Sequence, residues 1–412
     1  MKKLRIGVLF GGRSGEHEVS LLSAASVLNA IDKKKFDVVP IGITKSGKWV
    51  TDSHAERLLG TKPATADVAK HLRAGDPEAT PGAALLARGE GIIVPPMPSA
   101  DSFVPFHRDA GSTDSSINVD VIFPVLHGTF GEDGTIQGLL ELADIAYVGA
   151  GVLGSAAGMD KDVMKRLFQA AGLPMVKHVT VLRTAWESNP KKVRKKIESK
   201  LKYPLFVKPA NLGSSVGISK AHNGKELGPA MDVAASYDRK IVIEQGVGGA
   251  KHKAREIEVA VLGNDDAQAS IPGEIVPSAE FYDYAAKYLD EGSKLLIPAK
   301  LSNSDTKKVR QMAIDAFKAV DCSGLARIDF LMDPKTGKLF VNEINTMPGS
   351  LAFYLWDAQG MPPREMVDKL VAIARDVQAE KRKNNYDYQT NLVNLVDARG
   401  LKGTKGSKTR SG

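Results

Sequence analysis

The residues best suited to chemistry lie in the sequence GLARIDFLMDPKTGKLFVNEINTMPG, at positions 324–349. Two strand-like segments flank the turn sequence DPKTGK, so the run predicts a β-hairpin. Side chains alternate between the faces of a strand, which places Arg327 with Asp329, and Glu343 with Asn345, on one face. Three oxygen ligands beside a guanidinium suit a hard divalent cation that holds phosphate. The alternative is a solvated sheet face with cross-strand charge pairs.

A second run, KPANLGSSVG at 208–217, has the composition of a phosphate-binding loop. Its glycines allow close approach of the backbone, successive N–H groups can form an anion-binding nest, and two hydroxyls add donors. Lys208 ends an apolar strand, where it can reach phosphate oxygens. Alone, the run could be a flexible surface hairpin. Together with the hairpin face, it predicts a nucleotide site with metal on one wall and a glycine-rich flap on the other.

Two other glycine patterns are weaker evidence for a functional site. The run 149–154, GAGVLG, matches GxGxxG, but no acidic residue follows at the spacing of a dinucleotide-binding fold. The run 213–217, GSSVG, matches the nucleophile elbow of serine hydrolases, yet strand-like residues flank it on both sides, whereas the elbow joins a strand to a helix. No Walker A sequence is present, and His17 and His127 lack zinc-ligand spacing.

Composition is that of a soluble globular protein, with 43% hydrophobic and 25% charged residues among 412. One cysteine, no signal-peptide pattern and no long apolar run predict a cytoplasmic protein without membrane insertion. The net charge of +8 is largely local, since residues 381–412 carry eight basic and two acidic side chains. The terminal run LKGTKGSKTRSG at 401–412 has no aromatic residues to stack on bases, so we expect a disordered basic tail and no nucleic-acid partner.

The order of elements predicts an α/β domain followed by two α+β lobes. Strand, helix and strand open the chain, which indicates a parallel sheet. The expected strands are 4–10, 36–43, 119–126, 146–148, 205–209, 217–221 and 241–245, with further strands between 256 and 279. The expected helices are 14–30, 135–142, 159–171, 188–200, 303–320 and 362–382. The expected domains are 1–154, with an insertion at about 53–118 containing one or two short helices, 155–245, 246–382, and the tail 383–412.

With these motifs in order, the sequence resembles the ATP-grasp ligases, and within them the D-alanine–D-alanine ligases, over nearly all of residues 3–375. The resemblance is carried by GGRSGEHEVS (11–20), LHGTFGEDGTIQGLLE (126–141), MDK (159–161), VKPANLGSSVGISK (207–220), REIEVAVLG (255–263), FYDYAAKY (281–288), RIDF (327–330) and NEINTMPGS (342–350). It implies an N-terminal parallel α/β domain before a two-lobed ATP-grasp fold, ATP between the lobes, D-alanine where three domains meet, and a homodimer that makes peptidoglycan precursors.

The resemblance also implies a nucleotide site. Asp329, Glu343 and Asn345 match the ligands of two Mg²⁺ ions, which Mn²⁺ could replace. The residues that match contacts to ATP are Lys161, Lys208, Ser214, Ser215, Gly217, Glu244, Gln245 and Glu256. Among these, Glu244 matches the acceptor for the adenine amino group, and Glu256 lies near the ribose.

For the amino acids, the resemblance implies that Glu16 anchors the ammonium of the first D-alanine, with His127 beside it. Tyr288 matches a mobile-loop tyrosine that hydrogen-bonds with the Glu16–Ser214 pair, and Tyr282 and Lys287 belong to the same lid. Arg327 and the Gly349 N–H would hold the acyl phosphate and the oxyanion, with Ser350 in the same substrate site.

Three departures from the family leave the acceptor open. Gln245 stands where many members have lysine, the link 246–254 is longer and more basic than usual, and GSLAFYLWD at 349–357 replaces an FTxxS-type continuation. The prediction is therefore D-alanyl-D-alanine synthesis, with D-serine, D-lactate or another amino-acid pair as alternatives. A non-catalytic nucleotide-binding regulator is the alternative of another class.

Overall fold

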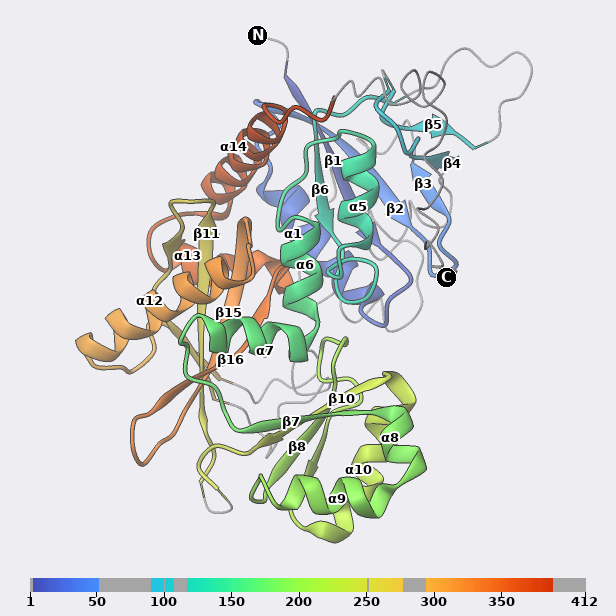
Figure 1. Ribbon diagram of the computed structural model, residues 1–412. Coiled ribbons are helices and arrows are strands. Elements are labelled where there is room, and N and C mark those ends of the chain that lie inside the picture. Colours follow the sequence, from blue (N-terminus) through green and yellow to red (C-terminus); the bar gives the residue numbers. More distant parts are fainter. Residues whose placement is uncertain are drawn as a thin grey trace, which may run out of the picture.

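The computed structural model describes residues 3–51, 90–99, 101–106, 117–249, 252–276 and 294–387. It contains three β-sheets with helices packed on them, arranged one after another along the molecule (Figure 1). The predicted class, an α/β domain followed by two α+β lobes, is confirmed. No helix within these ranges combines the length and the apolar character needed to cross a lipid bilayer.

The first sheet has six strands in the order β5-β4-β3-β2-β1-β6. Strand β1 pairs in parallel with β2 and with β6, as the opening strand–helix–strand pattern predicted. Strands β3, β4 and β5 extend the β2 edge in antiparallel fashion. The bounds are β1 Leu4–Gly11, α1 His17–Ala30, β2 Phe36–Ile43, β3 Trp49–Thr51, β4 Glu90–Ile93, β5 Val104–Pro105, β6 Val121–Val125, α5 Thr135–Leu142 and α6 Val152–Met159.

Much of the predicted insertion, including any helices within it, lies outside the described residues. Its described parts include the edge strands β4 and β5. The expected strand at 146–148 is reduced to one parallel bridge between Ile122 and Tyr147.

The second sheet has four antiparallel strands in the order β7-β10-β8-β9. Its core joins the strands to α9 and α10 through residues such as Ile197, Leu227 and Ile243. The bounds are α7 Lys161–Ala170, β7 His178–Leu182, α8 Arg183–Ser188, α9 Pro190–Glu198, β8 Leu205–Pro209, β9 Ser219–Ala221, α10 Gly224–Tyr237 and β10 Lys240–Gln245. Helix α7 precedes this sheet in sequence but packs with the third sheet through Met164 and Phe168.

The third sheet has the order β14-β13-β11-β15-β16, with β12 beside β11. The predicted hairpin is present as β15 and β16, and α12 covers one face of this sheet through Val309, Ala313 and Phe317. The bounds are β11 Arg255–Gly263, β12 Gln268–Ala269, β13 Gly273–Val276, β14 Lys294–Leu296, α12 Asn303–Ala319, β15 Gly324–Met332, β16 Leu339–Asn345, the 3₁₀ helix η1 Gly349–Ala352, α13 Phe353–Asp357 and α14 Pro363–Lys381.

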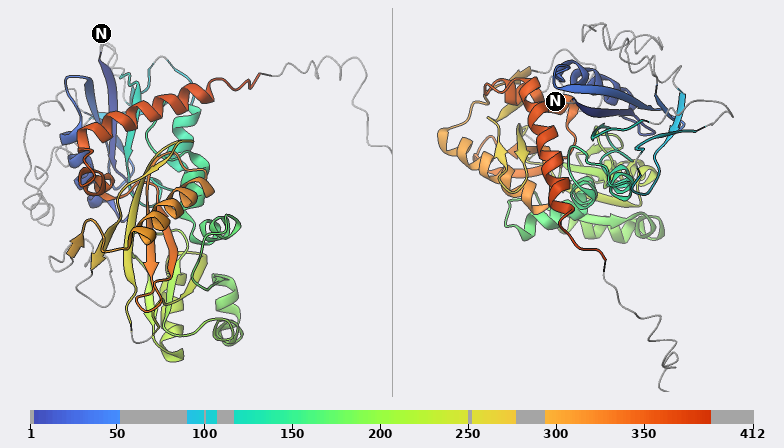
Figure 2. Two further views of the ribbon diagram at one scale, coloured as in Figure 1. Left: turned by 90° about the vertical axis from the view of Figure 1, so that its left-hand side faces the viewer. Right: turned by 90° about the horizontal axis from the view of Figure 1, so that it is seen from above.

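Helix α14 returns to the first domain, where it lies beside α1 and β6, and it also contacts β11 and β15 of the third sheet (Figure 2). Met366 and Leu370 are fully buried in the same core as Ile6 and Val8 of β1. Two ion pairs, Arg364 with Asp32 and Asp368 with Lys35, connect the exposed side of α14 to the segment that follows α1.

Candidate active site

The two acidic residues of the hairpin lie directly opposite one another. Asp329 of β15 is paired with Glu343 of β16, and Arg327 with Asn345, so the predicted common face is confirmed. The guanidinium of Arg327 donates two hydrogen bonds of 2.7 Å to the carboxylate of Asp329. The side-chain amide of Asn345 donates to the same carboxylate at 2.9 Å. The face is therefore a connected polar network.

Arg327 is fixed in its charged form. Burial alone would lower its pKa, but the contact with Asp329 and the nearby Glu258, 3.4 Å away, raise the pKa well above its usual value. A permanent positive charge beside two carboxylates suits a site where negative charge develops during a reaction.

The chemistry of the donor set fits a hard divalent cation. Among the residues that the structure describes, no three His, Cys, Asp or Glu side chains gather as a metal site. Asp329, Glu343 and Asn345 supply two carboxylates and one amide oxygen instead, which is the oxygen chemistry that Mg²⁺ prefers. The Lys161 ammonium lies 3.6 Å from the Glu343 carboxylate, as the Arg327 guanidinium lies beside Asp329. Each of the two carboxylates therefore has a cationic neighbour.

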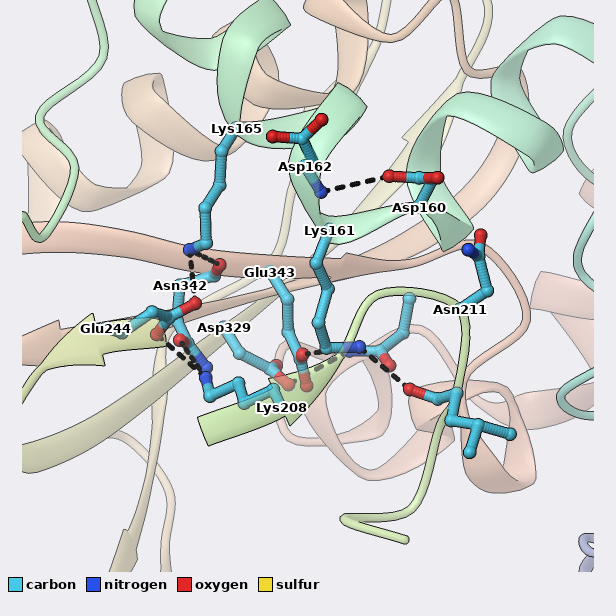
Figure 3. A network of polar contacts seen from close by, with 12 residues as sticks. Asp160, Lys161, Asp162, Lys165, Lys208, Asn211, Glu244, Asp329, Asn342 and Glu343 are labelled. Atoms are coloured by element: carbon cyan, nitrogen blue, oxygen red, sulfur yellow. Dashed lines mark hydrogen bonds and ion pairs between the residues drawn. The ribbon is translucent and has the colours of Figure 1, made fainter. Parts of the chain in front are cut away.

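Three charged side chains meet at the floor of this site, as Figure 3 shows. The Lys165 and Lys208 ammonium groups each lie 2.8 Å from one oxygen of Glu244, and all three side chains are buried. Burial alone would raise the pKa of Glu244, but the two lysines lower it to about 2. The floor thus carries two positive charges against one negative charge, which favours an anionic ligand.

Glu244 was predicted to accept the adenine amino group. Its carboxylate instead accepts from Lys208 and faces Lys165, so in this structure it positions two cations. A contact between Glu244 and adenine stays a prediction. Lys165 itself was missed, although it follows Lys161 by four residues and therefore shares its helix face.

A cavity of about 350 Å³ lies between the second and third sheets, above this floor. Its size is in the range of small-molecule sites. The predicted site residues that line it are Lys208, Ser215, Glu244, Gln245, Glu256, Arg327, Asp329 and Glu343. Lys161 and Asn345 border a smaller hollow next to it, together with Glu343. These residues therefore converge from both lobes.

The glycine-rich run is a loop between antiparallel strands β8 and β9, which excludes the nucleophile elbow. Ser214, Ser215 and Gly217 have φ angles of 47°, 59° and 71°, in the left-handed region. A turn that contains left-handed residues can point backbone N–H groups toward one side and form an anion nest.

The flap also reaches the first domain. The Ser214 hydroxyl hydrogen-bonds to the carboxylate of Glu16, at the N-terminal end of α1. A Cβ atom on Gly213 would stand 2.6 Å from the same carboxylate, so any larger residue would displace the Glu16 side chain from this position. Glu16 is only 8% exposed.

His127, which was predicted to flank a substrate, lies between Met347 and Ser23. Its Nδ1 lies 2.8 Å from the Met347 carbonyl oxygen and its Nε2 lies 2.9 Å from the Ser23 hydroxyl, so both ring nitrogens already have partners. Burial lowers the pKa of His127 to about 4, which keeps the ring neutral. Contact with substrate stays a prediction.

The remaining predicted residues divide into two groups. Gly349 and Ser350 lie in η1, which follows the Asn345 end of β16. Tyr282, Lys287 and Tyr288, the predicted lid, lie outside the described residues. Besides Lys165, prediction from sequence missed Ser23, Glu132 and Glu258, which are polar side chains around the same site.

Comparison with known proteins agrees with this geometry. The family model described as D-ala D-ala ligase N-terminus matches residues 5–150, and the model described as D-ala D-ala ligase C-terminus matches residues 167–372. The chain belongs to the D-alanine–D-alanine ligase family. This confirms the resemblance drawn from the motifs.

Individual relatives match over almost their whole length. A D-alanine–D-alanine ligase from Heliobacterium modesticaldum is 47% identical over 93% of this chain and 98% of its own. A D-alanine–D-alanine ligase from Bacillus cytotoxicus is 43% identical over 94% of this chain and 99% of its own. Among solved structures, the D-alanine–D-alanine ligase from Coxiella burnetii has a TM-score of 0.73 at 32% identity, covering 97% of this chain and 99% of its own. The VanG D-Ala:D-Ser ligase from Enterococcus faecalis has a TM-score of 0.74 at 35% identity, covering 90% of this chain and 100% of its own.

Proposed function

We propose that this family member is an ATP-dependent ligase that joins two D-alanines into D-alanyl-D-alanine for peptidoglycan synthesis. The observation that carries the proposal is the convergence of the Asp329–Glu343 pair, the Lys208 floor and the glycine-rich flap, through Ser215, on one cavity. The names of relatives with 43–48% identity support the same activity.

The proposed reaction has two steps. A carboxylate oxygen of the first D-alanine attacks the γ-phosphorus of ATP, ADP leaves, and an acyl phosphate forms. The amine of the second D-alanine then attacks the acyl carbon, loses a proton, and displaces inorganic phosphate. Two Mg²⁺ ions, held by Asp329, Glu343 and Asn345, would neutralise charge on the triphosphate.

We assign the remaining roles as follows. Lys161, Lys208 and the backbone of the loop 213–217 hold the phosphates, while Gln245 and Glu256 line the part of the cavity for the nucleoside. Arg327 and the Gly349 N–H stabilise the oxyanion that forms on attack. Glu16 holds the ammonium of the first D-alanine, because a buried carboxylate at a helix N-terminus is a fixed countercharge. The Tyr282–Tyr288 segment would exclude water from the acyl phosphate.

The direct test is phosphate release from ATP and Mg²⁺, with and without D-alanine, together with detection of the dipeptide. D-alanine-dependent release with one dipeptide per phosphate supports the ligase. Release with no amino acid requirement, or no release with any amino acid, contradicts it and favours a nucleotide-binding regulator. D-serine is the informative competing acceptor, because VanG is named for it and the 349–357 segment departs from the family.

Three further assignments are proposals. The division at 1–154, 155–245 and 246–382 is supported because each range contains one sheet. A cytoplasmic location follows from the reaction, since ATP is its substrate. A homodimer is inferred from the family, and light scattering of the purified chain tests it.

A further inference from the structure

Three side chains of the first domain hold one short loop of the C-terminal lobe. The loop follows β16 and contains Met347, Gly349 and Ser350. Glu132 accepts a hydrogen bond from the Met347 N–H at 3.0 Å, and His127 Nδ1 lies 2.8 Å from the Met347 carbonyl oxygen. Thus both backbone groups of Met347 bond to side chains from outside the lobe.

The third side chain, Ser23 of α1, holds the other end of the loop. Its hydroxyl oxygen accepts from the Ser350 N–H at 3.1 Å and lies 2.9 Å from His127 Nε2. Ser23 is 1% exposed, so water does not compete for these bonds. Gly349 therefore stands between two clamped residues.

The partners fix the direction of every bond. The Met347 carbonyl can only accept, so Nδ1 of His127 carries the hydrogen and donates. Burial keeps the ring neutral, so Nε2 must accept, and the Ser23 hydroxyl must donate to it. The Ser23 oxygen then accepts from the Ser350 N–H. One continuous chain of hydrogen bonds runs from Ser350 through Ser23 and His127 back to Met347.

The loop needs such support because its backbone is strained. Ser350, Leu351 and Ala352 have φ angles of 45°, 53° and 52°, and none of them is glycine. Consecutive left-handed residues are unfavourable for L-amino acids and persist only where the surroundings hold them. Leu351 and Ala352 are fully buried, which anchors the C-terminal end of the loop. Ser23, His127 and Glu132 anchor it at Met347 and Ser350.

We propose that Ser23, His127 and Glu132 are positioning residues that set the orientation of the Gly349 N–H toward the reacting acyl group. Ser23 and His127 line neither the nucleotide cavity nor the smaller hollow beside it, and Glu132 lines only the smaller hollow. The catalytic part of this inference rests on the proposed ligase function. Its consequence is that the first domain, besides binding an amino acid, assembles the oxyanion site of the C-terminal lobe.

The test is Ser23→Ala, which removes one acceptor and one donor. We expect kcat for dipeptide formation to fall about 10- to 100-fold, less than the roughly 10²- to 10³-fold cost of losing an oxyanion donor, because the Gly349 N–H is misoriented and not removed. The dissociation constant for ATP should change less than about twofold, because the nucleotide cavity is untouched. Ser26→Ala is the matched control: Ser26 lies on the same helix, and its hydroxyl donates to the Leu22 carbonyl at 3.2 Å. It should behave like the unmodified chain.

Glu132→Gln is the second variant. Glu132 accepts from both the Gly128 N–H, at 2.7 Å, and the Met347 N–H. Glutamine has one acceptor oxygen and can accept from only one of these two N–H groups. We therefore again expect a lower kcat with little change in the dissociation constant for ATP. Ser23→Thr retains the hydroxyl and should recover most of the rate if it melts like the unmodified chain.

Hydrogen exchange of the peptide 346–352 supplies a readout that needs no turnover. Faster exchange in Ser23→Ala, with lowered kcat, supports the inference. Unchanged exchange, or a kcat equal to that of Ser26→Ala, overturns it. If the unmodified chain makes no dipeptide, the proposed function fails and the catalytic part of the inference with it. Hydrogen exchange of the peptide 346–352 then still shows whether these side chains hold the loop.

Discussion

The Lys165 ammonium and the Glu244 carboxylate lie 2.8 Å apart, although their side chains are 0% and 3% exposed. A buried ion pair contributes little relative to apolar packing, but loss of one partner leaves a charge without compensation. Glu244 has a second partner in Lys208, also at 2.8 Å, and burial is tolerated because the three charges are arranged alternately. The pair therefore belongs both to the fold and to the floor of the nucleotide site.

Replacement of Lys165 by methionine should lower the free energy of unfolding by about 3 kcal/mol, the cost of breaking a buried pair. Urea unfolding followed by circular dichroism measures it. Lys369→Met is the control, because Lys369 pairs with Glu365 at 3.1 Å on an exposed helix face and should contribute at most about 0.5 kcal/mol. Equal losses in both variants would contradict the proposed importance of burial.

Replacement of Arg327 by alanine should lower kcat by about 10³-fold, because a fixed charge at the developing oxyanion is lost. ATP affinity should change much less, since the lysines of the floor remain. Arg327→Lys should recover only part of the rate, because lysine cannot form the paired 2.7 Å bonds to Asp329. Near-normal turnover of the alanine variant would argue against the assigned role.

Removal of divalent cations with EDTA should abolish turnover, and Mg²⁺ should restore it. Asp329→Asn and Glu343→Gln each remove one negative ligand, so the Mg²⁺ concentration for half-maximal rate should rise about tenfold or more. Titration of activity against Mg²⁺ measures this. Asp333→Asn is the control: Asp333 caps the exposed hairpin turn by accepting from the Lys335 N–H at 2.9 Å. A shifted Mg²⁺ requirement there would show that the effect is not specific.

Acid should destabilise the protein through His127. Its pKa is about 4 in the folded chain and about 6.5 when exposed, so the unfolded state binds the proton first. Stability should therefore fall as the pH drops from about 6.5 to about 4, by up to about 3 kcal/mol. Burial, with Glu16 nearby, raises the pKa of Glu132, and this contribution to stability has the opposite sign because it is lost as the pH rises through the folded pKa.

The comparison must therefore be between variants. His127→Gln should lack the added loss of stability below pH 6.5, whereas the unmodified chain should show it. Denaturant unfolding at pH 7.0, 6.0 and 5.0 measures the difference. Parallel pH curves for the two proteins would show that His127 does not titrate as described.

Local sequence patterns predicted the hairpin because strand alternation is a short-range property. The positions of Arg327, Asp329, Glu343 and Asn345 follow from a period of two and a turn. Helix α10 was missed because Gly224, Gly228 and Pro229 all disfavour helix in isolation. It forms nonetheless, since Leu227, Met231 and Ala234 are buried on the second sheet and the Asn223 side chain caps its start.

Other parts of the site could not be predicted from local sequence. Ser23 and Ser350 are separated by 327 positions, and their contact depends on how two domains meet. Lys165 could have been found from its spacing to Lys161, but its partner Glu244 could not. The motif containing His127 and Glu132 was identified, whereas their shared contact with Met347 is a property of the assembled fold.

The return of α14 to the core of the first domain has a consequence for biosynthesis. Met366 and Leu370 complete a core whose other half, including Ile6 and Val8, leaves the ribosome more than three hundred residues earlier. Nascent domains ordinarily fold in the order of their translation. Here the first domain stays incomplete until translation is nearly finished, so its exposed apolar sheet must be shielded in the meantime, and premature termination before residue 363 would yield a chain prone to aggregation.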